Sequence, residues 1–166
     1  AVWRPGYEEK KTSLSALSEI ISPGSSVYIE SGCGEPQHLV RSLILENMNL
    51  CDVQVYTSVP LSTYSDFGGD YGSRFRIQSF FISPNMTSAF ADGQADHLPL
   101  SSPGKLKLFT EGHITINTAL IQLSPPDSEG FMNLGVTVDI MKSIIERSDV
   151  VIAQVNRHMP VTRGDT

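Results

Sequence analysis

The residues best suited to chemistry form one short glycine-rich stretch. Residues 31–39 read Ser-Gly-Cys-Gly-Glu-Pro-Gln-His-Leu, with an apolar run before them and an amphipathic run after them. Gly32 and Gly34 can adopt backbone angles closed to other residues and let another molecule approach the main chain closely. Pro36 suits the first position of a helix, whose free N–H groups favour a negative charge above the loop. The stretch is a candidate site for an anion, a carboxylate or a developing oxyanion, unless its glycines serve only an ordinary strand-to-helix turn.

Two side chains inside this stretch could take part in a reaction. Cys33 would be a nucleophile as a thiolate beside a helix start. No histidine is tied to it by a motif, because His38 lies on the following helix, so a small residue that fills space is the simpler interpretation. Glu35 could be mistaken for a nucleophile. Its simpler role is that of a carboxylate held at a helix start by the helix dipole.

Other candidates are spread along the chain. Asp127 and Glu129 lie in the turn-rich stretch 124–133, where such residues form turns more often than acid/base pairs. Asn156 follows an apolar run, so it either donates its amide to a substrate carboxylate or forms a turn. The histidines are too scattered for a metal site to be expected.

The elements that must position these residues alternate between strands and helices. Strands are predicted at residues 27–29, 51–57, 74–82, 114–123 and 150–155. Helices are predicted after Thr12 or Ser13, after Pro36, after the two start signals Ser83-Pro84 and Ser101-Ser102-Pro103, and after a capping Asp139. Residues 114–123 and 150–155 are apolar on both faces, which is typical of buried parallel strands. The pattern predicts a layered α/β domain with a mainly parallel sheet flanked by helices.

In such sheets ligands bind beyond the carboxyl ends of the strands. Three loops leave strand ends here, at residues 32–36, 124–133 and 156–165. If all three strands are parallel, these loops lie on one edge and frame one site. A further long loop is predicted at residues 58–71, and it is either functional or a mobile segment of the surface. Residues 1–11 predict a polar arm across the surface.

Length and composition exclude several classes of protein. The chain has 166 residues, 40% of them apolar and 18% charged, as expected for one globular domain. Its net charge of −6 argues against nucleic-acid binding. No stretch has the apolar length of a membrane span. Cys33 and Cys51 lack the spacing of a zinc site or a disulfide framework, which favours a reducing compartment: the cytoplasm, or the mitochondrial matrix in a eukaryote.

Three stretches, in this order, resemble the markers of the acetyl-CoA hydrolase/transferase family, whose members include 4-hydroxybutyrate, acetate and succinate CoA-transferases. They are residues 31–36; residues 121–127 with Gly130-Phe131 and residues 134–136; and Val155-Asn156 with Met159-Pro160 and Gly164-Asp165. The resemblance covers nearly the whole chain but only the N-terminal half of the family, whose members are considerably longer. The chain is therefore expected to be one single-domain segment, residues 1–166, of a longer enzyme.

The resemblance implies two similar α/β halves of the NagB/RpiA/CoA-transferase type, with the active site between them. It implies that a glutamate carboxylate attacks an acyl-CoA thioester and then carries CoA as a glutamyl-CoA thioester to a second carboxylic acid. Each tetrahedral oxyanion needs preorganised donors. In the family that glutamate lies in the second half, and none of the nine glutamates here matches its motif. No catalytic residue is therefore expected in this chain.

The resemblance also suggests partners and binding residues. Acyl-CoA and a small carboxylate are the expected substrates, with no permanently bound cofactor and no metal, and a homo-oligomer such as a dimer is expected. The expected substrate-binding residues are Gly32, Cys33, Gly34, Glu35, Pro36, Ser124, Pro125, Pro126, Asp127, Gly130 and Asn156. Three alternatives stay open: a non-catalytic domain that binds a small carboxylate or an acyl-CoA, an acyl-CoA hydrolase, and a sugar-phosphate isomerase. The isomerase would need a basic phosphate pocket, which these loops do not suggest.

Overall fold

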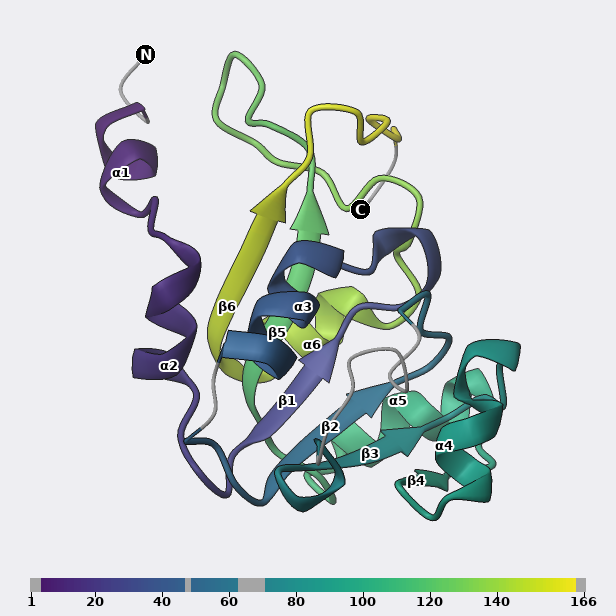
Figure 1. Cartoon of the computed structure of the whole chain (residues 1–166). Helices are drawn as coiled ribbons and strands as arrows, with labels where there is room; N and C mark the ends of the chain where they lie inside the picture. Colours follow the sequence, from purple (N-terminus) through teal and green to yellow (C-terminus); the bar gives the residue numbers. More distant parts are fainter. Residues whose placement is uncertain (1–3, 47–48, 63–70, 164–166) are drawn as a thin grey trace.

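Six parallel strands run through the middle of the molecule (Figure 1). The computed structural model describes residues 4–46, 49–62 and 71–163. Within these residues the strand order is β4-β3-β2-β1-β5-β6, and each neighbouring pair is parallel. The strands are β1 (Ser26–Ile29), β2 (Val53–Thr57), β3 (Phe75–Ser79), β4 (Ala95–His97), β5 (Ile116–Leu123) and β6 (Ser148–Val155). The predicted parallel α/β fold is confirmed.

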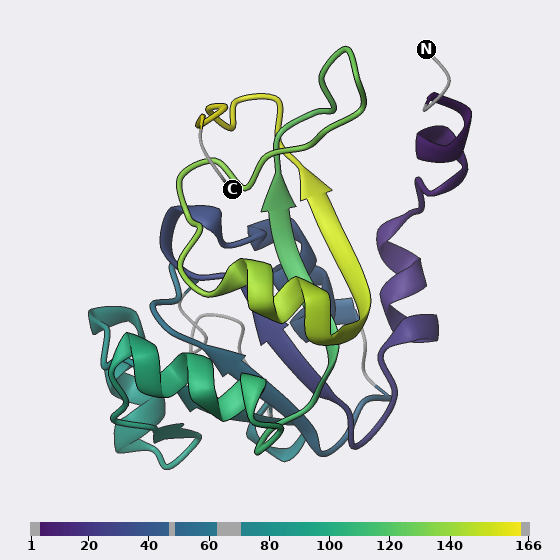
Figure 2. The same ribbon diagram turned by 180° about the vertical axis from the view of Figure 1, so that it is seen from behind.

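Helices cover both faces of this sheet, as the two opposite views show (Figures 1 and 2). The helices are α1 (Arg4–Glu9), α2 (Leu17–Ile20), α3 (Gln37–Glu46), α4 (Thr87–Ala91), α5 (Ser102–Thr110) and α6 (Met141–Arg147). Short 3-10 turns are η1 (Leu14–Ala16), η2 (Gly32–Gly34), η4 (Tyr71–Ser73) and η5 (Pro84–Met86). The buried residues of α2, α3 and α4 share one core cluster, and those of α5 and α6 share the other.

The core cluster that contains the buried residues of α5 and α6 is organised around one aromatic ring. Phe109 of α5 meets Tyr28, Tyr56 and Phe80 in edge-to-face contacts, with ring centroids 5.6, 6.2 and 6.0 Å away. This geometry suits the positive edge and negative face of aromatic rings. Because Tyr28 and Tyr56 lie on β1 and β2, and Phe80 follows β3, α5 is anchored across three strands close to their carboxyl ends.

The helices predicted after two start signals are both present, but only one of the two serines caps its helix. The hydroxyl of Ser101 accepts the N–H of Gly104 and caps α5. Ser83 precedes η5 and α4, but its hydroxyl makes no cap hydrogen bond. Pro36 lies just before α3 and accepts the N–H of Val40 through its carbonyl, so it caps the helix and is not its first residue. The polar arm at the N-terminus contains an exposed helix, α1.

Two predictions about the C-terminal third were wrong. Asp139 does not cap α6, because its backbone has a φ of +32° and Ile140 precedes the helix instead. Strand β6 was expected to be buried, but it is one of the two outer strands of the described sheet, and Val150, Val151 and Val155 are exposed. Its apolar pattern is that of an interior strand. Of the predicted loops, residues 63–70 of loop 58–71 and residues 164–165 of loop 156–165 lie outside the described residues.

Candidate functional site

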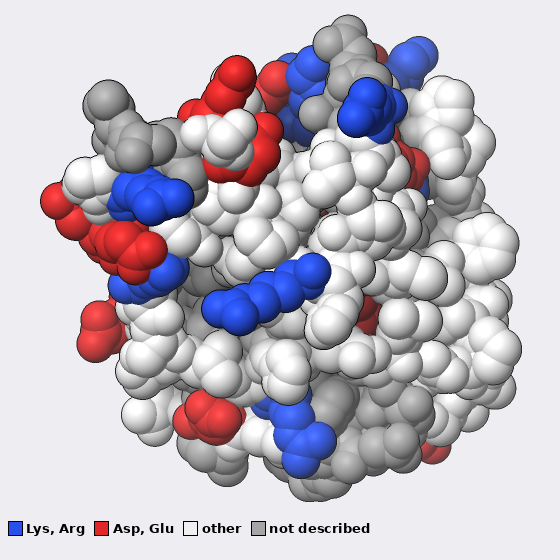
Figure 3. All heavy atoms as spheres, turned by 90° about the horizontal axis from the view of Figure 1, so that it is seen from above, with Lys and Arg blue, Asp and Glu red and all other residues white. Residues whose placement is uncertain are grey.

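The loops predicted to frame a site share one edge of the sheet. Because β1, β2, β5 and β6 are parallel, the loops that follow them all leave the carboxyl edge. Figure 3 views the molecule from this side, and the charged side chains gather toward one half of the view and leave the other half largely uncharged. The loops of this edge carry exposed apolar side chains: Val59 and Leu61 after β2, Phe81 and Ile82 after β3, Phe131 and Val136 after β5, and Val161 after β6.

The glycine loop folds into the single 3-10 turn η2 directly after β1. Gly32 has a φ of +57°, which favours glycine, and its N–H donates to the carbonyl of Val59 at 2.7 Å. Gly34 does not need a positive φ. A Cβ there would lie 2.4 Å from Glu30 Oε1 and 2.8 Å from Thr137 Cβ. The second glycine is therefore required by the packing of the chain itself. Gly34 is buried, whereas Gly32 is half-buried and Cys33 is exposed.

Cys33 does not fill core space as expected, because its side chain is exposed. It stands at the tip of the turn, and its carbonyl accepts the side-chain N–H of Gln122 on β5 at 3.3 Å. The thiol is thus presented to the carboxyl edge while the backbone behind it is held by the sheet.

Glu35 joins the glycine loop to the loop after β2. Its buried carboxylate accepts the backbone N–H groups of Leu61 and Ser62 at 2.6 and 3.0 Å, together with the Ser62 hydroxyl. Burial raises the pKa of this carboxyl, and these hydrogen bonds oppose that rise. The expected role at a helix start is wrong, because the carboxylate bonds the neighbouring loop and not the N–H groups of α3. Glu35 fixes the shape of the edge.

The start of α3 is occupied by a side chain of β6. The N–H of His38 donates to Gln154 Oε1 at 3.0 Å. Gln154 in turn donates to Gln122 Oε1 at 3.3 Å, and Gln122 reaches the carbonyl of Cys33. Neither glutamine was among the residues predicted for the site. Their signal was an amide side chain at the same register position in two otherwise apolar strands, where each side chain needs a partner.

A second glutamate, which sequence analysis also missed, lies beneath the turn. Glu30 follows β1 and is fully buried. Its Oε2 accepts the N–H of Gln122 at 2.6 Å, while Oε1 has no hydrogen-bond partner among the described residues. Burial raises the pKa of this carboxyl from 4.5 to about 8. At neutral pH Glu30 is mainly a neutral acid packed under Gly34.

Replacement of Glu30 should change how stability depends on pH. Between pH 4.5 and about 8 the folded protein keeps a proton that the unfolded chain has lost, so the free energy of unfolding falls as pH rises through this window. The fall is at most about 1.4 kcal/mol for each pH unit. Glu30→Gln stays neutral in both states, so its urea unfolding curves at pH 5 to 9 should show a much smaller slope with pH. Glu146→Gln, on the exposed face of α6, should keep the wild-type slope; an equal slope in Glu30→Gln would contradict the assignment.

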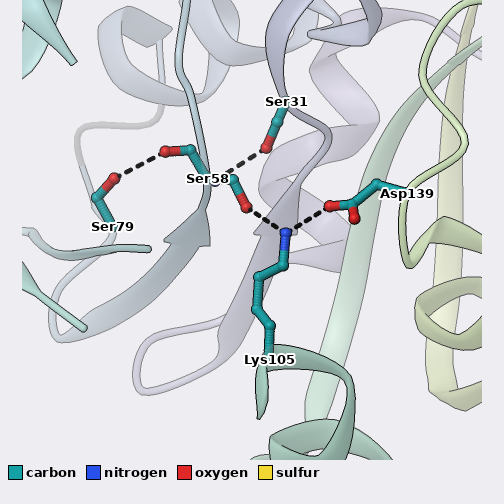
Figure 4. A network of polar contacts seen from close by, with 5 residues as sticks. All are labelled: Ser31, Ser58, Ser79, Lys105 and Asp139. Carbon is teal, nitrogen blue, oxygen red and sulfur yellow. Dashed lines mark hydrogen bonds and ion pairs between the residues drawn. The ribbon is translucent and has the colours of Figure 1, made fainter. Parts of the chain in front are cut away.

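A buried lysine ties α5 to two loops of the carboxyl edge (Figure 4). Lys105 Nζ lies 3.0 Å from Ser58 Oγ and 2.5 Å from Asp139 Oδ2. Ser58 donates its N–H to Ser31 Oγ at 2.9 Å, and its carbonyl accepts the hydroxyl of Ser79 at 3.1 Å. The network joins the ends of β1, β2 and β3 to the loop before α6. It explains why Asp139 turns away from the helix that it was expected to cap.

The loop 124–133 is closed by its own side chains. Asp127 Oδ1 accepts the N–H groups of Glu129, Gly130 and Phe131 at 2.8 to 3.0 Å, so the turn-forming alternative is confirmed for Asp127. At its base, Ser124 Oγ accepts the N–H of Asn133 at 3.0 Å. The tip of this loop extends beyond the sheet and away from the glycine loop in both ribbon views (Figures 1 and 2). Of the predicted binding residues here, Ser124, Pro125 and Pro126 lie near the strand end and Asp127 and Gly130 near the tip.

Side-chain hydrogen bonds also hold the loop after β6 and attach it to the loop after β5. The side chain of Asn156 accepts the N–H of His158 at 2.9 Å, which is the turn-forming alternative considered for it. Asn133 reaches across to Thr162, donating to its carbonyl at 2.8 Å and accepting its N–H at 3.2 Å. Sequence analysis did not single out Asn133. Hydrogen bonds therefore join the loop after β5 to the loop after β6.

Two further findings concern cofactors and membranes. Among residues 4–46, 49–62 and 71–163, no group of three or more His, Cys, Asp and Glu side chains is arranged to hold a metal ion. Within the same part of the chain, no helix has both the length and the apolar character needed to cross a bilayer.

The sequence resembles known proteins over nearly its whole length. Residues 2–166 match the acetyl-CoA hydrolase/transferase N-terminal domain. A succinyl-CoA:acetate/propanoyl-CoA:succinate CoA transferase from Fasciola hepatica is 32% identical over 147 residues, which are 87% of this chain and 30% of that protein. A 4-hydroxybutyrate coenzyme A transferase from Clostridium kluyveri is 30% identical over 164 residues, which are 99% of this chain and 38% of that protein. The chain thus spans less than two-fifths of the length of these curated relatives.

The fold has a counterpart among solved structures. A 4-hydroxybutyrate CoA-transferase from Porphyromonas gingivalis superposes on 98% of this chain with a TM-score of 0.73 and 21% identity, and the match covers 37% of that chain. At this identity the likeness establishes the fold alone. The expected fold of the CoA-transferase type is confirmed.

Proposed function

Because the chain belongs to the acetyl-CoA hydrolase/transferase family, as its N-terminal domain, we propose that it forms one part of a CoA-transferase. The enzyme moves CoA between an acyl-CoA and a small carboxylic acid such as acetate or 4-hydroxybutyrate. Residues 1–166 form one half of the active site, and a second α/β half forms the other. CoA and acyl-CoA are substrates, and the enzyme needs no permanently bound cofactor.

One observation supports this function most strongly. Three contacts hold the glycine loop: Gly32 bonds Val59 after β2, Cys33 bonds Gln122 of β5, and the Glu35 carboxylate bonds the backbone of the loop after β2, an arrangement we call the Glu35 clamp. The Gly32–Cys33 edge of the turn stays accessible. A turn held in this way can place backbone groups near a thioester carbonyl without rearranging during the reaction. The expected binding role of Gly32, Cys33 and the ends of the β5 and β6 loops remains part of the proposal.

The nucleophile is proposed to come from outside residues 1–166. Its carboxylate attacks the thioester carbonyl, CoA leaves as a thiolate, and an acyl-glutamyl anhydride forms. The thiolate then attacks the glutamyl carbonyl of the anhydride, which releases the first carboxylic acid and leaves a glutamyl-CoA thioester. Glu30 and Glu35 are poor candidates for this step because both are buried and both already accept backbone N–H groups.

The exposed apolar side chains at the carboxyl edge support a covered interface. Phe81, Ile82 and Phe131 are strongly exposed on loops of this edge, and large exposed apolar side chains are often covered by a partner surface. We assign this face to the second half, and we expect the enzyme to be a homo-oligomer. The free thiols of Cys33 and Cys51 suit a reducing compartment such as the cytoplasm.

A transfer assay tests this function. The native polypeptide that carries residues 1–166, incubated with acetyl-CoA and labelled 4-hydroxybutyrate or butyrate, should form the new acyl-CoA and release acetate. Residues 1–166 alone should not. Release of free CoA without transfer would assign the enzyme to the hydrolases, and saturable binding of acyl-CoA without either reaction would leave a binding domain.

Glu35→Gln should slow this transfer by roughly ten- to a thousandfold, about 1.4–4 kcal/mol in the barrier. The reason is the clamp: an amide at this position turns one donor toward the N–H groups of Leu61 and Ser62, which both need an acceptor. The covalent CoA adduct should still form, because Glu35 is not the nucleophile. Glu46→Gln, on the exposed end of α3, is the matched control and should keep wild-type turnover; equal rates in the two variants would show that the clamp does not serve the reaction.

A further inference from the structure

A buried carboxyl group lies directly beneath the glycine turn. A Cβ added to Gly34 would stand 2.6 Å from Cδ of Glu30, so the carboxyl group packs against the underside of the turn. The Glu30 side chain is fully buried by other residues of this chain. Its environment is therefore set within residues 1–166, whatever else covers the carboxyl edge.

The contacts of Glu30 suit a neutral acid and not a carboxylate. Its Oε2 accepts the N–H of Gln122, whereas Oε1 has no partner among the described residues. A buried carboxylate is normally paired with a cation or held by several donors. Of the ion pairs within residues 4–46, 49–62 and 71–163, none includes Glu30. The buried Lys105 is already paired with Asp139 (Figure 4). The proton of Glu30 therefore belongs on Oε1.

The other groups around Glu30 would not balance a charge on it. Tyr28 stands two residues earlier on β1, and burial raises the pKa of its phenol, so it stays neutral. Cys33 stands on the turn above, with its thiol exposed. Gln122 on β5 and Thr137 in the loop before α6 carry no charge. Loss of the proton from Glu30 would therefore place an uncompensated negative charge under the turn.

The turn above Glu30 keeps one main-chain donor free. The three other N–H groups of residues 32–35 donate to main-chain carbonyl groups. These bonds leave the N–H of Cys33 without an acceptor among the described residues, so it is available to a bound oxyanion. The carbonyl of Cys33 accepts the side-chain N–H of Gln122, whose main-chain N–H bonds Glu30. One residue thus holds both the buried carboxyl group and the residue that carries the free donor.

We propose that Glu30 is a positioning residue that sets how much negative charge the glycine turn can hold. While Glu30 is neutral, the free N–H of Cys33 stabilises an oxyanion. Once Glu30 loses its proton, the buried carboxylate repels that oxyanion and transfer slows. Such repulsion is strong over a few ångströms where water is excluded. The consequence for transfer rests on the proposed function, whereas the effect on the turn does not.

The pH dependence of transfer tests the proposal. Because burial raises the pKa of Glu30 to about 8, kcat/KM of the native polypeptide that carries residues 1–166 should fall about tenfold for each pH unit above this value. Glu30→Gln cannot ionise, so its profile, normalised to its own maximum, should stay flat to about pH 9.5. Glu146→Gln, exposed on α6, should keep the wild-type decline.

The rates are compared only at pH values where circular dichroism shows each protein to be folded. A merely structural effect of Glu30→Gln would lower the rate equally at every pH and leave the decline in place. The same decline in Glu30→Gln as in the wild type would overturn the proposal. An active wild type with no decline in this window would overturn it as well.

A thiol on the turn gives a readout that needs no transfer. Iodoacetamide alkylates the thiolate, and a negative charge beneath the turn opposes its formation at Cys33. At about pH 9, peptide mass spectrometry should show Cys33 alkylated at least about threefold faster in Glu30→Gln than in the wild type. Cys51, which is also exposed, precedes β2 at the opposite edge of the sheet and should react equally in both.

The alkylation result separates this proposal from the proposed function. Equal Cys33 rates in the two proteins would overturn the effect of Glu30 on the turn, with or without transfer activity. Faster alkylation of Cys33 in Glu30→Gln, in a polypeptide that shows no transfer, would uphold that effect and refute the proposed function.

Discussion

Gly34→Val is expected to abolish CoA transfer and to lower the free energy of unfolding by about 3 kcal/mol. A Cβ at this position would stand 2.4 Å from Glu30 Oε1, 2.6 Å from Glu30 Cδ and 2.8 Å from Thr137 Cβ. Glu30 is fully buried and its Oε2 accepts the N–H of Gln122, so moving its carboxyl group aside would break this hydrogen bond. The turn must lift away from β1, which displaces the Gly32–Cys33 edge. Urea unfolding and the transfer assay measure the two effects.

Gly6→Val is the matched control, because a Cβ at Gly6 in α1 meets no atom within 4 Å. It should leave both unfolding and transfer close to wild type. The double variant Gly34→Ala/Glu30→Ala should be less destabilised than the sum of its single changes, because the shorter residue 30 removes the clash. Additive effects, or normal turnover in Gly34→Val, would contradict the packing argument.

Lys105→Met is expected to lower the free energy of unfolding by about 3 kcal/mol. Methionine keeps the aliphatic volume but removes the charge that meets Asp139 and Ser58. The Lys105 side chain is 7% exposed and the Asp139 side chain 33%, so the orphaned carboxylate regains only part of its hydration. For this reason the loss should fall at the lower end of the range for buried ion pairs. Chemical unfolding at pH 7 measures it.

The ion pair between Arg76 and Asp96 provides the comparison. Its side chains are 66% and 51% exposed, although it too joins residues that are distant in sequence. Arg76→Met should cost at most about 1 kcal/mol, because exposed pairs gain little from their attraction. If Lys105→Met proved as mild as Arg76→Met, the network in Figure 4 would have no part in holding the carboxyl edge.

Much of the fold could be predicted from local signals. The alternating, valine-rich run at residues 51–57 predicted β2, and the run at residues 114–123, which is apolar on both faces, predicted β5. Ser101 and Gly112 bracketed α5 through a cap and a residue with a φ of +75°. The outer position of β6 could not be predicted in the same way. Its apolar pattern is that of a strand covered on both faces, but the pattern does not show which other strands lie beside it.

The edge at which the candidate loops meet was predictable, but the contacts that hold those loops were not. Parallel strands alone determine that the loops after β1, β5 and β6 share one edge. The partners of Glu35 and Asp139 lie 26 and 34 residues away in sequence, so no local rule could find them. Local rules favour the helix dipole and the helix cap for these residues, whereas long-range hydrogen bonds determine their actual roles. Glu30 escaped notice for the same reason, since only the fold reveals that it is buried beneath Gly34.

These contacts suggest structural roles for three of the acidic residues in this chain. Three acidic side chains of the described carboxyl edge hold loops in place: Glu35 bonds the loop after β2, Glu30 bonds Gln122, and Asp139 bonds Lys105. In the proposed enzyme we therefore expect residues 1–166 to present the glycine turn, and we expect the reactive carboxylate to come from outside them.

The most direct test is to locate the covalent intermediate. The native polypeptide that carries residues 1–166 is incubated with acyl-CoA, treated with borohydride to reduce the thioester, digested, and mapped by mass spectrometry. We predict a single modified glutamate outside residues 1–166, with Glu30 and Glu35 unmodified. Modification of Glu30 or Glu35 in the wild-type enzyme, lost when that residue is changed to glutamine, would contradict the account and place the nucleophile in this half.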